Sequence, residues 1–379
     1  MPTFQAIVLS GGGSKGPFGL GVLLALEKFR RERNKQVTSL YCGASVGALN
    51  ATMAAQGDLD GLDELYKKLR TKDILGTPGS KVRRRVLAWN ASRKPYHYFR
   101  NDSLRETVAR HVKFDALKDA HLLVCVTNFV TGRLETFYKS SVIDEFLEKE
   151  NKIDPVDRRL HYYHRIESQD QLVQVLLASA AIPFYFPPVE INGEKYVDGG
   201  VGNNTPLRQA AYLSRYLHSN NQSVLPTICV INDPKRFSID EDADVGMFGV
   251  IRRSLDIFHN ELVQDSLNTW ERINTNIRAT KAREKRVASI LESLPADIRE
   301  STKEKISEAL REEVGVAAKM ELPMYQIRPS APLLDDVLCF DPGTARRLKY
   351  QGVEDCLKSL LGHSDITEND YARWVDEIR

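Results

Sequence analysis

The sequence predicts an α/β fold with three layers, α/β/α, built on a central, mostly parallel sheet and followed by a helical C-terminal flank. First, apolar runs of strand length at residues 6–9 and 226–231 show no alternation, as expected for strands covered on both faces. Second, helix-length apolar segments such as residues 17–29 lie between such runs. Third, glycine-rich turns at residues 10–16 and 43–47 join a strand directly to a helix.

The composition limits the classes of protein to which the chain can belong. With 42% hydrophobic and 27% charged residues, the 379-residue chain is typical of a globular protein. Its 53 basic and 51 acidic residues give a net charge of +2, which does not favour nucleic acid as a partner. The five cysteines stand singly, so we expect no metal site and a reducing compartment. The first strand begins near residue 6 and no apolar run reaches about 18 residues, so we expect a cytoplasmic protein without signal peptide or membrane span.

A tight strand-to-helix turn surrounds Ser45. Residues 43–47, Gly-Ala-Ser-Val-Gly, fit the G-x-S-x-G pattern of a nucleophile elbow, in which a strained turn holds the serine hydroxyl clear of the backbone. Gly43 and Gly47 leave room for strand and helix to pass closely, and Ala44 and Val46 complete the turn. The helix that follows directs its N-terminal amides at the serine. Because the pattern is common, an incidental serine in an ordinary turn is the alternative.

A second glycine motif follows the first strand. Residues 11–16 read Gly-Gly-Gly-Ser-Lys-Gly, and Pro17 opens the next helix. A strand, a glycine loop and a helix N terminus together form a cradle for an anion. The same residues match the dinucleotide fingerprint, but the second strand ends in Gly-Ala-Ser at 43–45, where that fold needs an acidic residue. No Gly-Lys-Ser/Thr closes the loop as in a P-loop, so we expect no cofactor.

These two motifs occur together with Asp198-Gly199-Gly200 in the order and spacing of the patatin-like phospholipase family, which the sequence resembles over roughly residues 5–235. The segment before the aspartate, residues 179–189, resembles that family's pattern as well. The resemblance implies a patatin-like form of the α/β/α fold. It also implies a serine acyl hydrolase, of the phospholipase A or lysophospholipase type, that cleaves fatty-acyl esters of membrane lipids.

The resemblance further implies roles for individual residues. Ser45 would be the nucleophile and Asp198 its base, without a histidine between them. Backbone amides of the glycine loop would bind the oxyanion, and this loop comprises Gly11, Gly12, Gly13, Ser14, Lys15 and Gly16. Gly199 and Gly200 complete the Asp-Gly-Gly motif. Since an exposed aspartate is a poor base at pH 7, we expect burial or bound lipid to raise the pKa of Asp198.

Three alternatives stay open. A Ser-Asp-His triad would take its histidine from later in the chain, where His218, His259 and His363 are available, although none lies in a recognisable motif. A catalytically inactive lipid-binding module is the second alternative, which the intact Ser45 and Asp198 oppose. Some bacterial patatin-like lipases act in antiphage defence and are activated by a cyclic nucleotide, so a regulated effector of this kind is the third.

We expect three regions along the chain: a patatin-like catalytic core at 1–235, a helical insertion or flank at 236–322, and a strand and helices at 323–379 that complete the domain. Within the core, residues 81–100 are basic with interspersed aromatics. This pattern predicts either a flap that touches phospholipid head groups or a solvated surface loop. Apolar positions at helical spacing between residues 255 and 277 predict a long helix, and residues 281–315 are charge-dense and helical in pattern.

The expected partners follow from this chemistry. We expect a phospholipid or another acyl ester as substrate, transient contact with the inner membrane face, and no nucleic acid. The sequence leaves open the acyl-chain, positional and head-group preferences, the activating ligand, and whether the chain forms a homo-oligomer.

Overall fold

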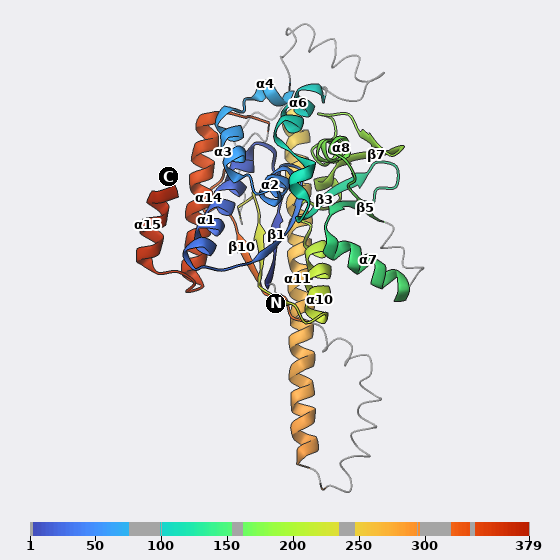
Figure 1. Cartoon of the computed structure of the whole chain (residues 1–379), viewed down its shortest axis with the longest axis vertical. Coiled ribbons are helices and arrows are strands. Elements are labelled where there is room, and N and C mark those ends of the chain that lie inside the picture. The colour runs from blue at the N-terminus through green and yellow to red at the C-terminus, as the bar shows by residue number, and fades with distance from the viewer. Residues whose placement is uncertain are drawn as a thin grey trace.

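A central sheet flanked by helices on both faces makes up the body of the protein (Figure 1). The fold is taken from a computed structural model that describes residues 3–75, 99, 101–153, 162–234, 247–293, 295, 320–333 and 338–378. Apart from Phe99, the basic segment predicted as a flap at residues 81–100 lies outside the described residues.

The sheet is mixed and mostly parallel. Seven of its strands lie side by side in the order β10 (Met324–Ile327), β9 (Thr227–Val230), β1 (Thr3–Leu9), β2 (Thr38–Ala44), β3 (His121–Asn128), β4 (Leu134–Lys139) and β5 (Tyr163–Arg165). Neighbours are parallel from β10 to β3, whereas β4 runs antiparallel to β3. A hairpin of β6 (Val189–Ile191) and β7 (Glu194–Asp198) pairs with β3, and β8 (Ser223–Val224) pairs with β1. The carboxyl ends of β1 and β2 therefore meet at one edge, where sites of α/β proteins usually form.

Alternate residues of β1 enter two different cores. Ile7 and Leu9 pack on one side of the sheet, and Ala6 and Val8 pack on the other, each no more than 1% exposed. The first core is covered by α1 (Gly16–Glu32), α2 (Val46–Ala55), α3 (Leu59–Lys68), α8 (Gln169–Ser179), α14 (Pro342–Gly362) and α15 (Glu368–Ile378). The second is covered by α7 (Ser141–Ile153), α10 (Leu207–Ser219) and α11 (Met247–Glu292). This arrangement confirms the predicted three-layer α/β/α fold.

Shorter helices connect these layers. They are η1 (Gly13–Lys15), α4 (Thr71–Leu75), α6 (Asp102–His111), η2 (Phe114–Leu117) and α9 (Gly199–Asn203). The sequence did not predict α9, because its Gly-Gly start disfavours a helix by propensity.

The C-terminal helix α14 packs directly on the N-terminal helix α1. A Cβ atom built on Gly21 would lie 2.0 Å from the Lys349 carbonyl oxygen, and one on Gly352 would lie 2.1 Å from the Phe18 carbonyl oxygen. Only glycine permits this approach of the two backbones. The strand predicted near residues 323–329 forms β10, beside β9. Both ends of the chain therefore contribute to one core.

Helix α11 is a single helix of 46 residues. Its middle part buries Val263 and Trp270 in the second core, and the Trp270 indole and the Asn274 side-chain amide donate to the Leu322 carbonyl at 2.9 and 2.8 Å. Towards Glu292 it extends away from the other described elements (Figure 1). The predicted long helix and the start of the charge-dense segment are thus continuous. Within the described part of the chain, every helix is too short or too polar to cross a membrane.

Candidate active site

Ser45 sits in a strained turn between β2 and α2. Its backbone has φ 54° and ψ −130°, a left-handed conformation that is rare for a residue with a side chain. The flanking glycines explain how the turn fits: a Cβ on Gly43 would lie 2.3 Å from the Gly47 carbonyl oxygen, and one on Gly47 would lie 2.2 Å from the Leu9 carbonyl oxygen. Ser45 itself is 7% exposed. The local geometry is that of a nucleophile elbow.

Asp198 ends β7 and caps the N terminus of α9. Its Oδ1 accepts a hydrogen bond from the Gly200 amide at 2.7 Å. Its Oδ2 is buried and makes no hydrogen bond of ordinary geometry within the described part of the chain. Burial raises the pKa of Asp198 to about 7, against the lowering effects of the Gly200 amide and of the Ser45 side chain beside it. A carboxylate whose pKa lies near neutral pH, and which lies next to a serine, is suited to accept the serine's proton.

The Asp-Gly-Gly motif fits tightly beside the elbow. A Cβ on Gly199 would lie 2.2 Å from the Cys125 carbonyl oxygen and 3.3 Å from the Ala44 Cβ. Because Gly199 has no side chain, the start of α9 can approach the end of β2. Through this packing the fold brings together Ser45 and Asp198, which the sequence separates widely.

The glycine loop lies against the same turn. A Cβ on Gly11 would lie 3.0 Å from the Ser45 Cβ, so the loop passes directly over the serine. Gly12 and Gly13 have φ of 153° and 55°, which side-chain-bearing residues rarely adopt. The Asn232 side-chain amide donates to the Ser10 and Gly11 carbonyls, each at 3.0 Å, and so fixes the start of the loop.

Several amides of the loop are used within the protein. The Gly11 amide donates to the Asn204 carbonyl at 3.2 Å, and the Lys15 amide donates to the Gly12 carbonyl at 3.1 Å. The Gly16 amide donates to the Gly13 carbonyl. Of the predicted oxyanion donors at residues 11–16, the amides of Gly11, Lys15 and Gly16 are therefore already used, and the middle of the loop is the better candidate.

The Lys15 side chain points to a buried partner. Its Nζ lies 2.6 Å from Asp233 Oδ1, and both side chains are about nine-tenths buried. Asp233 lies just after β9, so this ion pair ties the loop to the neighbouring strand. The ion pair anchors the loop to the sheet. The glycine motif alone did not indicate this role for Lys15.

The three candidate histidines occupy different environments. His218 lies in the last turn of α10, and His363 stacks on Tyr325 with ring centroids 4.2 Å apart. His259, on α11, approaches the site, because a Cβ on Gly200 would lie 3.4 Å from its Nε2. Burial lowers the pKa of His259, the Asp233 carboxylate opposes this effect, and Lys15 adds to it. This proximity depends on how α11 packs on α9, so no local sequence pattern marks it.

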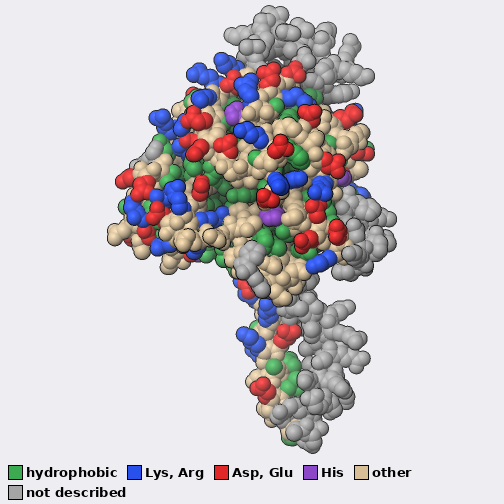
Figure 2. Space-filling view, in the orientation of Figure 1, with side chains coloured by type: hydrophobic (Ala, Val, Ile, Leu, Met, Phe, Trp, Pro, Cys, Tyr) green, Lys and Arg blue, Asp and Glu red, His purple; other side chains and the backbone are tan. Residues whose placement is uncertain are grey.

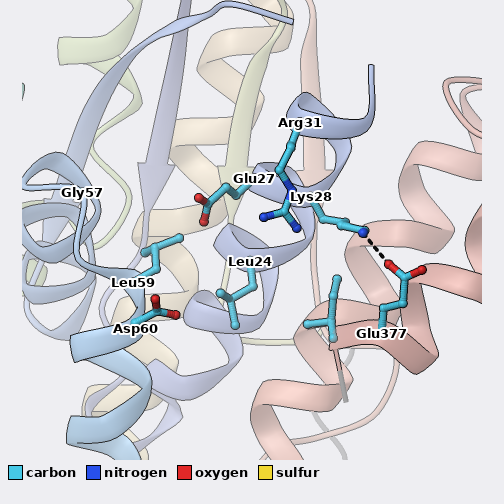
Figure 3. Close-up of a pocket in the computed structure, with 9 residues that line it drawn as sticks. Leu24, Glu27, Lys28, Arg31, Gly57, Leu59, Asp60 and Glu377 are labelled. Atoms are coloured by element: carbon cyan, nitrogen blue, oxygen red, sulfur yellow. Dashed lines mark ion pairs between the residues drawn. The ribbon is translucent and has the colours of Figure 1, made fainter. Parts of the chain in front are cut away.

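A separate pocket lies between α1, α3 and α15, where an ion pair joins Lys28 to Glu377 (Figure 3). It has a volume of about 340 Å³ and is lined mainly by charged side chains of both signs. None of the predicted site residues lines it, so it is not the candidate active site.

Acidic and basic side chains are mixed over the face shown in Figure 2, in keeping with the small net charge. No group of three or more metal-binding side chains occurs among the described residues.

A sequence model of the patatin-like phospholipase family matches residues 7–211, more than half of the chain, and spans the glycine loop, Ser45 and Asp198. The chain belongs to the patatin-like phospholipase family. This confirms the resemblance drawn from its motifs.

Two known proteins are similar to this patatin-like chain. A cGAMP-activated phospholipase from Pseudomonas aeruginosa is 28% identical over 211 residues, which are 54% of this chain and 55% of that protein. The match thus spans about half the length of this curated relative. The crystal structure of VipD from Legionella pneumophila covers 95% of this chain and 67% of its own, with 16% identity and a TM-score of 0.40.

Proposed function

We propose that this chain hydrolyses fatty-acyl esters of phospholipids through a dyad in which Ser45 is the nucleophile and Asp198 the general base. The observation that carries the proposal is the buried Asp198 carboxyl. Among the described residues one of its oxygens finds no ordinary hydrogen bond. The pKa of Asp198 is raised to about 7, and Ser45 is its neighbour in a strained turn. Family membership supports the same chemistry.

The reaction would proceed in two halves. The Ser45 hydroxyl transfers its proton to Asp198 as its Oγ attacks the ester carbonyl, forming a tetrahedral oxyanion. This intermediate collapses, the bond to the leaving alcohol breaks, and Asp198 returns the proton to that alcohol. The acyl-Ser45 ester is then attacked by water, whose proton Asp198 accepts. The second tetrahedral intermediate collapses, the bond between the acyl carbon and Ser45 Oγ breaks, and Asp198 returns the proton to Oγ, which releases the fatty acid and restores the Ser45 hydroxyl.

The oxyanion would be stabilised by backbone amides of Gly12 and Gly13. These residues lie between the loop positions whose amides are used within the protein, and the loop passes over Ser45. Their left-handed backbone turns the chain sharply at this point. Fixed donors at the site of developing charge commonly contribute about 10²–10³ in rate each.

Phospholipids lie in membranes, so the reaction requires contact with a lipid surface. We propose this contact to be transient and peripheral, at the inner membrane face. The basic segment at residues 81–100 stays a sequence-based hypothesis for the contact.

Activation by a nucleotide is the second candidate property. It is favoured by the similarity of this chain to a cGAMP-activated phospholipase from Pseudomonas aeruginosa. An enzyme that degrades membrane lipids of its own cell needs an inactive state. On this proposal the purified chain hydrolyses no lipid by itself and becomes active when the nucleotide is present.

The test is to incubate the purified chain with vesicles of defined phospholipids, with and without cGAMP, and to identify the products by mass spectrometry. We expect free fatty acid and lyso-lipid from wild type and none from Ser45→Ala. Ser214→Ala is the matched control, because Ser214 is a fully buried serine on α10. Release only with cGAMP would support the regulated alternative. No release under either condition, or equal release by Ser45→Ala, would overturn the proposed dyad and favour an inactive lipid-binding module.

A further inference from the structure

The Ser179 hydroxyl connects the nucleophile elbow to the sheet. The Ser45 backbone amide donates to Ser179 Oγ at 2.9 Å, and the Ser179 hydroxyl donates to the Cys125 carbonyl oxygen at 2.7 Å. Ser179 ends α8 and is completely buried. A serine in a helix often bonds a carbonyl of its own helix. Here the hydroxyl instead bridges two other segments, β3 and the turn before α2.

The Ser45 amide needs such a partner because of where it lies. Ser45 is the N-cap of α2, and amides at the start of a helix have no acceptor within that helix. The residue is also buried, so water does not readily replace the acceptor. Ser179 Oγ supplies the acceptor for the backbone amide of Ser45, whose φ of 54° is strained.

The same segment also holds the acid. Two residues after Ser179, the Ala181 carbonyl accepts a hydrogen bond from the Asp198 amide at 3.0 Å. The backbone amides of both proposed dyad members are therefore bound by residues 179–181. Since α8 packs in the first core, this short segment is itself rigidly placed. A shift of the segment would move the serine and the carboxylate relative to one another.

We propose that Ser179 is a positioning residue of the reaction: its hydroxyl fixes the Ser45 backbone at the distance and orientation that Asp198 requires. The inference rests on the proposed function of Ser45 and Asp198. Ser179 does not touch the substrate. It acts through the amide of Ser45, so its loss affects the chemical step and leaves binding of the lipid largely unchanged.

Two substitutions separate hydrogen bonding from packing. Ser179→Ala removes the hydroxyl and leaves a small gap. Ser179→Cys fills the space but replaces the hydroxyl with a weak hydrogen-bonding group. Ser214→Ala is the matched control, because Ser214 is an equally buried serine whose hydroxyl has no hydrogen-bond partner within the described residues. A packing role for Ser179 predicts that Cys restores function, whereas the positioning role predicts that it does not.

The experiment measures two quantities for each variant. The first is kcat and KM for hydrolysis of a soluble acyl ester, where a misplaced nucleophile should lower kcat by about 10²-fold without raising KM. The second is hydrogen exchange of the Ser45 amide by mass spectrometry, which should quicken by about tenfold when its acceptor is lost. We expect both changes in the Ala and Cys variants and neither in Ser214→Ala.

Wild-type kcat and unchanged Ser45 exchange in Ser179→Ala would overturn the inference. So would restored kcat in Ser179→Cys, or a loss confined to KM. A wild-type chain that hydrolyses no ester would overturn the proposed function instead. In that case the exchange of the Ser45 amide still decides whether Ser179 holds the elbow.

Discussion

Replacing Asp198 by asparagine tests whether its buried carboxylate is the general base of the reaction. The amide keeps an oxygen for the Gly200 amide, which donates to Oδ1 at 2.7 Å in the wild type. It cannot accept a proton from Ser45, so kcat/KM should fall by about 10²–10⁴-fold, the usual contribution of a general base. In the wild type, kcat/KM should rise with pH through about 7, because only the ionised Asp198 acts as a base.

The same substitution should stabilise the fold above neutral pH. The pKa of Asp198 is higher in the folded chain than its ordinary value of 3.8, because burial disfavours the charged form. Between about pH 4 and pH 7 the folded state therefore binds more protons than the unfolded state, and stability falls as pH rises through this window. A pKa of about 7 corresponds to about 4 kcal/mol lost above pH 7, at about 1.4 kcal/mol per pH unit. Asp198→Asn has no charge to bury and should avoid this loss.

Urea denaturation of both proteins at pH 4 and pH 8 measures the difference. We expect nearly equal stabilities at pH 4 and an asparagine variant that is more stable by up to about 4 kcal/mol at pH 8. Asp341→Asn is the matched control, since Asp341 also caps a helix and accepts from the Thr344 amide at 2.8 Å, but is exposed. Its backbone hydrogen bonds lower its pKa, so the asparagine should bring no gain at high pH. An active Asp198→Asn enzyme, or one that is less stable than wild type at pH 8, would refute the reasoning.

Three further changes probe the surroundings of the dyad. Gly13→Val forces a side chain onto a residue with φ 55° and should lower kcat by about 10²–10³-fold with little change in KM, whereas a raised KM alone would make the loop a binding element. His259→Ala should leave most of the ester hydrolysis intact in a dyad, and a loss of about 10³-fold or more in the folded variant would indicate a triad. Asp233→Asn leaves Lys15 buried without its carboxylate, so the free energy of unfolding should drop by about 3–5 kcal/mol, and unchanged urea denaturation would contradict a structural anchor.

The fold was predictable because its signals are local. Unbroken apolar runs marked the buried strands. An Asn-Gly pair is typical of a two-residue hairpin turn, and Asn192 and Gly193, both with positive φ, join β6 to β7 in this way. The nucleophile turn and the Asp-Gly-Gly motif were likewise recognisable as short sequence patterns. Their glycines are nevertheless required by contacts both near and far along the chain, since Gly43 lies against Gly47 but Gly199 lies against Cys125.

The supporting residues of the site were not predictable from the sequence. Asn204, Asn232 and Asp233 act on the glycine loop across contacts of about 190 to 220 residues of sequence separation, and no local pattern marks such pairs. Ser179 stood in a segment resembling the family's pattern, but its bond to the Ser45 amide depends on how α8 packs. His259 approaches Gly200 because α11 lies on α9, which a periodic apolar stripe does not specify.

Covalent labelling with a fluorophosphonate probe tests the central claim that Ser45 is an activated nucleophile. The probe reacts with serines that have lost their proton to a neighbouring base. Peptide mass spectrometry of the labelled wild type, with and without cGAMP, should find one adduct, on Ser45. Labelling should vanish in Ser45→Ala, become much slower in Asp198→Asn, and persist in Ser214→Ala. An adduct on another residue, or labelling of Ser45 at the wild-type rate in Asp198→Asn, would contradict the account.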